Sequence, residues 1–280
     1  MAFLQEALDD SDVENCGKCR NCNPELLLSE EFDFDLANKA GQYLRRSYQK
    51  IRPKKQWPKT SMFRYYPFEG YRIPPELQAS EGRALSLWGD AGWGQMVVEG
   101  KYVLGRFSND LVHACVEMIK AWKPDPFPRW VTCIPSDNHP GLVPDFTERL
   151  ADALGLPYVP CIQVYRKHRP QKGMENSYHQ AKNLDGAFQI TDEFRSGECL
   201  LIDDMIDSGW TLTVVSVLLR KAGCKAVYPL ALAQNSPRSL SENMRCVVTP
   251  QNRVRIHADL KIIATLFDDN TRVLWPIMWM

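Results

Sequence analysis

Short apolar segments alternate with longer amphipathic segments between residues 129 and 233, and this alternation constrains the fold more than any other feature of the chain. The apolar segments with the length of buried strands are RWVTCIPS, YVPCIQV, GECLLIDD and KAVYPLALA. The amphipathic segments typical of helices are PDFTERLADALG and TLTVVSVLLRKAG. Because strands and helices that alternate in this way form βαβ units, the sequence predicts an α/β fold with a parallel, Rossmann-like sheet.

The size and charge of the chain limit the classes of protein to which it can belong. A chain of 280 residues with 44% hydrophobic content can bury one α/β core and carry a smaller module at one end. Its 34 basic residues match 34 acidic residues, so no overall field draws it to nucleic acid or to a lipid surface. It has no run of about 18 apolar residues and no signal-peptide pattern at its start. We therefore expect a cytoplasmic protein without a membrane partner.

Charge also divides the chain along its length. Residues 1–35 hold ten carboxylates and two basic side chains, whereas residues 36–68 hold nine basic side chains and no carboxylate. Such an asymmetry marks an N-terminal module that is distinct from the segment after it. The expected parts are a module at 1–35, a basic and aromatic linker region at 36–82, an α/β domain at 83–235 that includes a helix at 109–122, and a tail without a motif at 236–280.

The segment LLIDDMIDSGWTLT, residues 200–213, has the features of a phosphate-binding site. It begins as an apolar strand and then enters a short loop that opens an amphipathic helix. Open α/β sheets bind their ligands at this kind of strand-to-helix junction. Ser208 and Thr211 offer hydroxyl donors, Gly209 permits a close backbone approach, and the first N–H groups of the helix would point at an anion. An ordinary strand-turn-helix with a capping serine or threonine is the alternative.

Two adjacent carboxylates, Asp203 and Asp204, are expected where this strand ends. They can accept hydrogen bonds from the hydroxyls of a ribose, or hold Mg²⁺ through its waters. Trp210 stands where a Walker-type loop would need a lysine, which disfavours a nucleoside triphosphate. The junction therefore favours a sugar phosphate as its ligand.

This junction resembles the signature of the type I phosphoribosyltransferases. In that family two acidic residues meet the ribose and a D-[ST]-G-x-T loop meets the 5-phosphate of 5-phosphoribosyl-1-pyrophosphate (PRPP). The resemblance implies a parallel sheet with helices on both faces, a flexible hood, and Mg²⁺ bound with PRPP. It also nominates Asp207 as a general base, although the same residue could cap the following helix. The substrate-binding residues that it implies in this segment are Asp203, Asp204, Asp207, Ser208, Gly209, Trp210 and Thr211.

Weaker features of the same family lie elsewhere in the chain. Residues after the strand RWVTCIPS are positioned like the family's pyrophosphate loop, where a turn presents backbone N–H groups to the anion; a plain loop is the alternative. The basic stretch YRKHRPQKG could close over pyrophosphate or remain a solvated loop. Gln180, Asn183 and Phe188 resemble the pattern of ComF-like members. The residues implied for the pyrophosphate loop are Pro135, Ser136 and Asp137.

Three cysteines gather in CGKCRNC near the start of the chain. Thiolates at this spacing can bind one Zn²⁺, but a closed structural site needs a fourth ligand that is missing locally; three free thiols are the alternative. Together with MAFLQEALDD, the motif resembles the zinc-binding subdomain of RecQ-family DNA helicases, whose first cysteine would fall just upstream of Met1. The expected zinc ligands in this small helical module are Cys16, Cys19 and Cys22.

The RecQ resemblance implies a C-terminal part of a longer DNA-repair protein, with a helicase polypeptide encoded upstream. The chain has no P-loop lysine motif and no DEAH-type box, so by itself it should not unwind DNA. Residues 39–64 combine basic and aromatic side chains, which suits contact with DNA. A packing stripe with a solvated basic face explains the same pattern, and we favour it.

Two functions follow from these features. In the first, the protein binds PRPP and transfers the phosphoribosyl group to a nucleobase-like acceptor with release of pyrophosphate. In the second, it is a non-catalytic module that senses PRPP or a nucleoside monophosphate and regulates a DNA-binding helicase partner. No motif in the sequence identifies an acceptor base.

Overall fold

A computed structural model of the chain describes residues 33–136, 138–166 and 177–235. The chain divides into two compact units, Met1–Lys39 and Ala40–Met280. Of the first unit only residues 33–39 are described, and they include the first turns of α2 (Phe34–Arg46). The backbone N–H of Leu36 donates to Oδ1 of Asp33 at 3.1 Å, which satisfies one of the free donors at the start of this helix. The predicted zinc ligands and the predicted tail lie outside the described residues.

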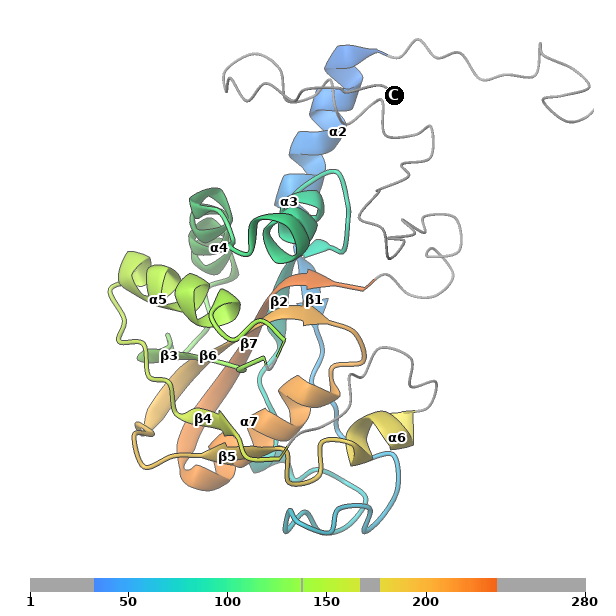
Figure 1. Cartoon of the computed structure of the whole chain (residues 1–280), viewed down its shortest axis with the longest axis vertical. Coiled ribbons are helices and arrows are strands. Elements are labelled where there is room, and N and C mark those ends of the chain that lie inside the picture. The colour runs from blue at the N-terminus through green and yellow to red at the C-terminus, as the bar shows by residue number, and fades with distance from the viewer. Residues whose placement is uncertain (1–32, 137, 167–176, 236–280) are drawn as a thin grey trace, which may run out of the picture. The chain divides into compact units, whose positions relative to one another are not determined.

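The second unit is built on a mostly parallel sheet of five strands in the order β1-β2-β7-β6-β3 (Figure 1). The edge strand β1 is antiparallel to β2, and every other neighbouring pair is parallel. The predicted α/β fold with a parallel sheet is therefore confirmed. The strands are β1 (Gln49–Ile51), β2 (Gly82–Leu87), β3 (Trp130–Cys133), β6 (Gly197–Ile206) and β7 (Cys224–Gln234).

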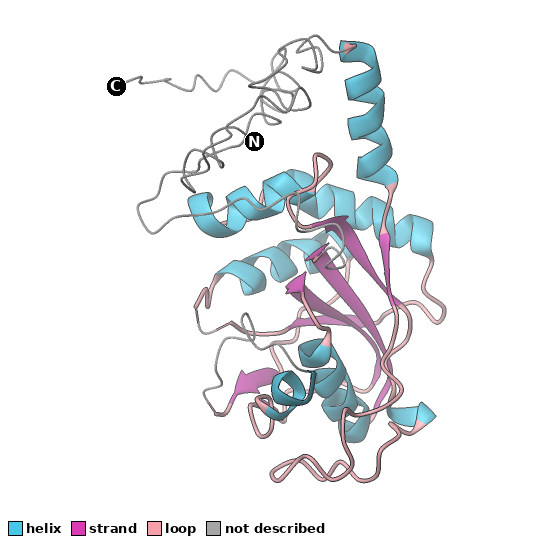
Figure 2. Ribbon diagram, turned by 90° about the vertical axis from the view of Figure 1, so that its right-hand side faces the viewer, coloured by secondary structure: helices cyan, strands magenta, loops and turns pink. Residues whose placement is uncertain are grey.

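Helices cover both faces of this sheet (Figure 2). Along β6, Leu200 and Ile202 pack into a buried cluster with one set of helices, whereas Cys199 and Leu201 pack into a second cluster with α7. This alternation, and the burial of both faces, explain why β6 is an almost continuous apolar run. The first set comprises α3 (Gly94–Glu99), α4 (Asn109–Trp122) and α5 (Leu142–Leu154), and the second cluster includes α7 (Trp210–Ala222) and α6 (Ser177–Lys182).

The segment YVPCIQV does not form the expected strand of the main sheet. Tyr158 makes one parallel bridge to Val131, and the chain then leaves the sheet. The strand that follows, β4 (Ile162–Val164), pairs with β5 (Phe188–Ile190) in a separate two-stranded antiparallel sheet. Pro160 explains the difference, because proline has no N–H with which to continue a ladder of hydrogen bonds.

Residues 49–73 pack against the sheet and α7 in the same unit, although we expected a linker there. Trp57 and Tyr66 are 3% and 9% exposed, and the ring centroids of Trp57 and Trp210 lie 6.1 Å apart. The aromatic side chains of this segment therefore belong to the core of the α/β unit.

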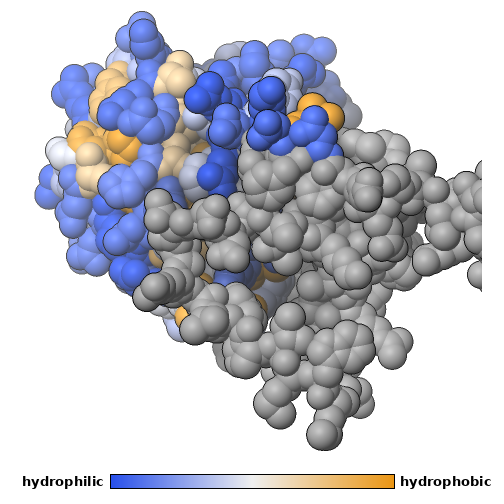
Figure 3. All heavy atoms as spheres, turned by 90° about the horizontal axis from the view of Figure 1, so that it is seen from above, coloured by the Kyte–Doolittle hydropathy of each residue, from blue (hydrophilic) through white to orange (hydrophobic). Residues whose placement is uncertain are grey.

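The described part of the surface is mainly hydrophilic in the view of Figure 3, with small apolar areas between the polar ones. Among the described residues, no helix combines the length and the apolarity that a membrane span requires.

Candidate functional site

The strand that leads to the junction with α7 is an inner strand of the sheet, because β6 lies between β7 and β3. β6 continues to Ile206, so the two aspartates lie within the strand and not at its end as predicted. The longer strand is stabilised by β7, with Met205 paired to Ala233 and Ile206 paired to Gln234. Three residues, 207–209, then connect the strand to α7.

Asp203 and Asp204 are neighbours on this strand, and so their side chains leave on opposite faces of the sheet. The backbone N–H of Asp204 donates to Oδ1 of Asp203 at 2.9 Å. On its own face, the Asp204 carboxylate forms an ion pair with Lys101, whose Nζ lies 2.7 Å from Oδ2. Lys101 comes from a π-helical turn, residues 100–104, that follows α3.

Burial and then the negative charge of Asp204 raise the pKa of Asp203 well above its ordinary value. The charge of Lys101 and the hydrogen bond from the Asp204 N–H oppose this rise. Two adjacent carboxylates of this kind do not ionise independently of each other. Such a pair suits the hydroxyls of a sugar, each of which both donates and accepts hydrogen bonds.

The helix α7 begins without a side-chain cap. Its N-cap residue is Gly209, at φ +76°, which has no side chain that could cap the first N–H groups of the helix. The first bond of the helix runs from the N–H of Thr213 to the carbonyl of Gly209 at 3.1 Å, and the Thr213 hydroxyl donates to the same oxygen at 2.9 Å. The first N–H groups of a helix have no partner within it. This geometry argues against the capped strand-turn-helix and leaves the helix start suited to an anion.

The loop residues differ in their exposure. Asp207 is exposed, and its Oδ1 accepts a hydrogen bond from Nδ2 of Asn235 at 3.0 Å, so it does not cap α7. The N–H of Asn235 in turn donates to the carbonyl of Ile206 at 2.8 Å. Ser208 and Thr211 are half-buried. Trp210 is 5% exposed and packs on Trp57, so its backbone, and not its ring, is the part available to a ligand in the loop.

The predicted pyrophosphate loop begins beside the acidic pair. β3 runs parallel to β6, with Cys133 paired to Ile202, and the N–H of Ile134 donates to the carbonyl of Ile202 at 2.9 Å. Pro135 and Ser136 follow directly and are half-buried. Asp137 lies outside the described residues. Parallel strands bring their carboxyl ends to one edge of the sheet, and this explains how two distant segments approach the same place.

The other predicted family features are described in part. Of the basic stretch, Arg166 is described and lies over the ring of Tyr65, with its guanidinium carbon 3.8 Å from the centroid. The remainder, Lys167, His168, Arg169 and Lys172, lies outside the described residues. Gln180 is buried in α6, and the backbone of Phe188 is held in β5 by the hydroxyl of Tyr66.

The sequence analysis did not identify two basic residues that the structure brings to this junction. One is Lys101, described above. The other is Lys54, whose Nζ lies 4.4 Å from the centroid of the Trp210 ring. Both come from segments far from β6 in the sequence and belong to no recognised motif. The local sequence pattern therefore did not indicate that either lysine lies at this site.

The acidic pair can hold Mg²⁺ only with help from a ligand. Among residues 33–136, 138–166 and 177–235, no group of three or more His, Cys, Asp and Glu side chains could hold a metal ion. Mg²⁺ prefers octahedral oxygen coordination and is commonly bound by one or two carboxylates together with waters and substrate phosphates. Since Asp203 and Asp204 lie on opposite faces of β6, one carboxylate of the pair, with waters and substrate phosphates, fits this second mode.

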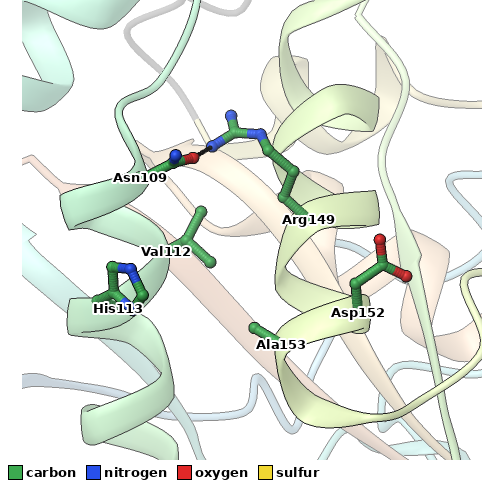
Figure 4. Close-up of a pocket in the computed structure, with 6 residues that line it drawn as sticks. All are labelled: Asn109, Val112, His113, Arg149, Asp152 and Ala153. Carbon is green, nitrogen blue, oxygen red and sulfur yellow. Dashed lines mark hydrogen bonds between the residues drawn. The ribbon is translucent and has the colours of Figure 1, made fainter.

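A separate shallow pocket of about 300 Å³ lies between α4 and α5 (Figure 4). Its lining includes Arg149, which donates to Oδ1 of Asn109 at 2.7 Å and to the carbonyl of Phe107 at 2.8 Å. Arg149 also forms an ion pair with Asp145. These bonds give the arginine a structural role that ties the two helices together, and none of the lining residues comes from β6 or α7.

The chain has one match to a family model and several matches to solved structures. Residues 145–262 match the family model described as the phosphoribosyl transferase domain. The search of curated proteins found no match. The chain is similar at 14% identity to a crystal structure of adenine phosphoribosyltransferase, with a TM-score of 0.35 and coverage of 72% of this chain and 92% of that one.

Two further adenine phosphoribosyltransferase structures are each 13% identical to this chain, with TM-scores of 0.34. The enzyme from Saccharomyces cerevisiae, complexed with adenine and an imino-altritol bisphosphate, is matched over 71% of this chain and 89% of its own. For the enzyme from Leishmania donovani the shares are 80% and 91%. The segment that matches the family model, residues 145–262, contains β6, the loop at 207–209 and α7.

Proposed function

We propose that the protein binds PRPP at the junction of β6 and α7 and transfers its phosphoribosyl group to a nucleobase-like acceptor. The observation that carries this proposal is the uncapped start of α7, which follows the acidic pair within a segment that matches the phosphoribosyl transferase family. The first N–H groups of α7 and the hydroxyls of Ser208 and Thr211 would receive the 5-phosphate there. The carboxylates would receive the ribose hydroxyls.

Each predicted residue has a role in this proposal. Asp203 and Asp204 bind the ribose, and the loop after β3 binds pyrophosphate through its backbone. The 5-phosphate is bound by the hydroxyls of Ser208 and Thr211 and by the backbone of residues 208–211. The pyrophosphate loop comprises Pro135, Ser136 and Asp137, and Mg²⁺ bound with PRPP would neutralise charge on the pyrophosphate.

The proposed reaction replaces one bond at the anomeric carbon. The bond to the pyrophosphate oxygen breaks through an oxocarbenium-like state, a bond to a nitrogen of the acceptor forms, and that nitrogen loses its proton. Asp207 is exposed and can accept this proton on its carboxylate, of which Asn235 engages Oδ1. Preorganised charge provides most of the help in such a reaction, because there is no covalent intermediate with the protein.

Titration calorimetry with PRPP and Mg²⁺ tests the binding, and release of pyrophosphate with a panel of nucleobases tests the transfer. We expect saturable binding of one PRPP per chain, and turnover with at least one base. A protein that is folded by circular dichroism but binds neither PRPP nor ribose 5-phosphate would refute the proposal.

The hydrogen bond between Asn235 and Asp207 favours a second candidate, a non-catalytic module that senses PRPP or a nucleoside monophosphate. In this case the amide of Asn235 binds Oδ1 of Asp207, which gives this carboxylate a structural contact in place of a catalytic role. Saturable PRPP binding without release of pyrophosphate, in the wild type and in an Asn235→Ala variant, would support the sensor over the enzyme.

We further propose, from the sequence alone, that Cys16, Cys19 and Cys22 bind a structural Zn²⁺ and that the chain works with a RecQ-type helicase in DNA repair. Metal analysis of the wild type and a Cys19→Ser variant tests the zinc. For DNA, the region 39–64 offers exposed charges such as Arg52 and Lys59, whereas Trp57 is buried in the core. A salt-dependent mobility shift with single-stranded DNA, lost when these charges are neutralised, tests that contact.

A further inference from the structure

We propose that Lys54 is a ligand of the 5-phosphate, and that the phosphate site is therefore completed by a side chain from outside the segment that matches the phosphoribosyl transferase family. This inference rests on the proposed function, because it concerns the same loop at the start of α7. It goes beyond the D-[ST]-G-x-T pattern, which contains no basic residue.

The backbone around Lys54 is held by ordered structure on both sides. β1 ends three residues before it, at Ile51, and is paired with β2. After it, the carbonyl of Lys55 accepts a hydrogen bond from the N–H of Ile73 at 2.9 Å, and the N–H of Trp57 donates to Tyr71 at 2.9 Å. A side chain carried by a backbone fixed in this way can be directed at one place on a neighbouring element.

That place is the first turn of α7. Nζ of Lys54 lies 4.4 Å from the centroid of the Trp210 ring, and Cε lies 3.7 Å from the position that a Cβ atom at Gly209 would occupy. Gly209 is the N-cap of the helix and Trp210 is its first residue. The ammonium group is therefore beside the loop that we assign to the phosphate.

The electrostatics of this position are unfavourable without an anion. The start of a helix carries a partial positive charge, so a cation there is destabilising. Within the described residues, Lys54 has no ion pair and no hydrogen bond, and the Trp210 ring is its one charge-stabilising contact. Burial also lowers the pKa of Lys54, as expected of an ammonium group that lacks a carboxylate. A phosphate dianion would pair with the ammonium group of the lysine and accept hydrogen bonds from the free N–H groups at the helix start.

Packing alone is the competing explanation, in which the aliphatic part of the lysine covers Trp210 and its charge is incidental. A Lys54→Met variant separates the two explanations, because methionine retains a flexible apolar chain that packs well on an aromatic ring. Lys55→Met is the matched control, since it removes the same charge from the adjacent, exposed residue and leaves its backbone bond to Ile73 in place.

The experiment is titration calorimetry of the full chain with ribose 5-phosphate and, separately, with inorganic pyrophosphate and Mg²⁺. For Lys54→Met we expect the affinity for ribose 5-phosphate to fall by about 10- to 100-fold, as for loss of a charge-assisted hydrogen bond. The affinity for pyrophosphate and the melting temperature should stay near the wild-type values. Lys55→Met should leave both affinities unchanged, and Lys54→Arg should retain most of the affinity for ribose 5-phosphate.

The outcomes distinguish this inference from the function on which it rests. If the wild type binds ribose 5-phosphate and Lys54→Met binds it equally well, the role of Lys54 is overturned and the proposed function stands. An equal loss for ribose 5-phosphate and pyrophosphate would also overturn it, since this indicates a general effect of charge. If the wild type binds neither ribose 5-phosphate nor PRPP, the proposed function and this inference both fall.

Discussion

Nζ of Lys101 lies 2.7 Å from Oδ2 of Asp204, and the two side chains are only 14% and 11% exposed. One member of the acidic pair is thus neutralised by a residue from a helical turn outside the segment that matches the family model. The ion pair joins the turn at residues 100–104 to the centre of the sheet. It also means that a ligand meets an acidic pair whose charge is already partly balanced.

Removal of Lys101 should destabilise the protein, because a largely buried carboxylate would lose its partner. We expect Lys101→Met to lower the free energy of unfolding by about 1–3 kcal/mol in urea denaturation at neutral pH. Lys120→Met is the control, since Lys120 forms an ion pair with Glu117 at 2.8 Å but both side chains are 67% exposed. Exposed pairs contribute little. An equal effect of the two substitutions would contradict the structural role of the buried pair.

The raised pKa of Asp203 should make stability fall as pH rises. A carboxyl whose pKa is higher in the folded state binds its proton more tightly there, so ionisation is penalised above the ordinary value of 3.8. Asp203→Asn removes this penalty. The variant should match the wild type below about pH 3.8 and become progressively more stable than it as pH rises through the raised pKa. The measurement is the difference in unfolding free energy across pH; a constant difference would count against the raised pKa.

Gly209 should be replaceable only at a cost in backbone strain. Its φ of +76° is unfavourable for residues with a Cβ, while the nearest atom to that Cβ, Cε of Lys54, is 3.7 Å away and causes no clash. We therefore expect Gly209→Ala to cost about 1–2 kcal/mol of stability. Gly41→Ala is the control, because Gly41 lies within α2 with open space around it. This substitution should stabilise the protein by about 0.5–1 kcal/mol. Thermal unfolding of the three proteins measures both effects.

The elements that local pattern determines were predictable from the sequence. The apolar run GECLLIDD predicts a strand at 197–204, and β6 is Gly197–Ile206. The amphipathic segment TLTVVSVLLRKAG predicts a helix at 211–223, and α7 is Trp210–Ala222. The helix predicted at 109–122 coincides with α4. In each case burial of an apolar face decides the structure, and that face is visible as a period in the sequence.

The parts that depend on distant segments were not predictable in this way. The run YVPCIQV has the composition of a core strand, but whether it enters the sheet depends on which neighbours remain unpaired beyond Pro160. Lys54 and Lys101 reach the site from segments whose only local signal is a positive charge. Their roles arise from tertiary packing, which places a lysine over Trp210 and another beside Asp204, and no spacing in the sequence encodes either contact.

Substitution at either the phosphate end or the ribose end of the site should weaken PRPP binding. Thr211→Ala removes a hydroxyl from the half-buried first turn of α7, and Asp204→Asn removes a carboxylate charge on β6. Each should weaken PRPP binding by about 1–3 kcal/mol, as expected for loss of a charge-assisted hydrogen bond. Ribose 5-phosphate lacks the pyrophosphate but keeps both groups, so its affinity should fall in parallel. Thr211→Ser retains the hydroxyl and should bind nearly as the wild type does, whereas unchanged affinity in both Thr211→Ala and Asp204→Asn would place the ligand elsewhere in the molecule.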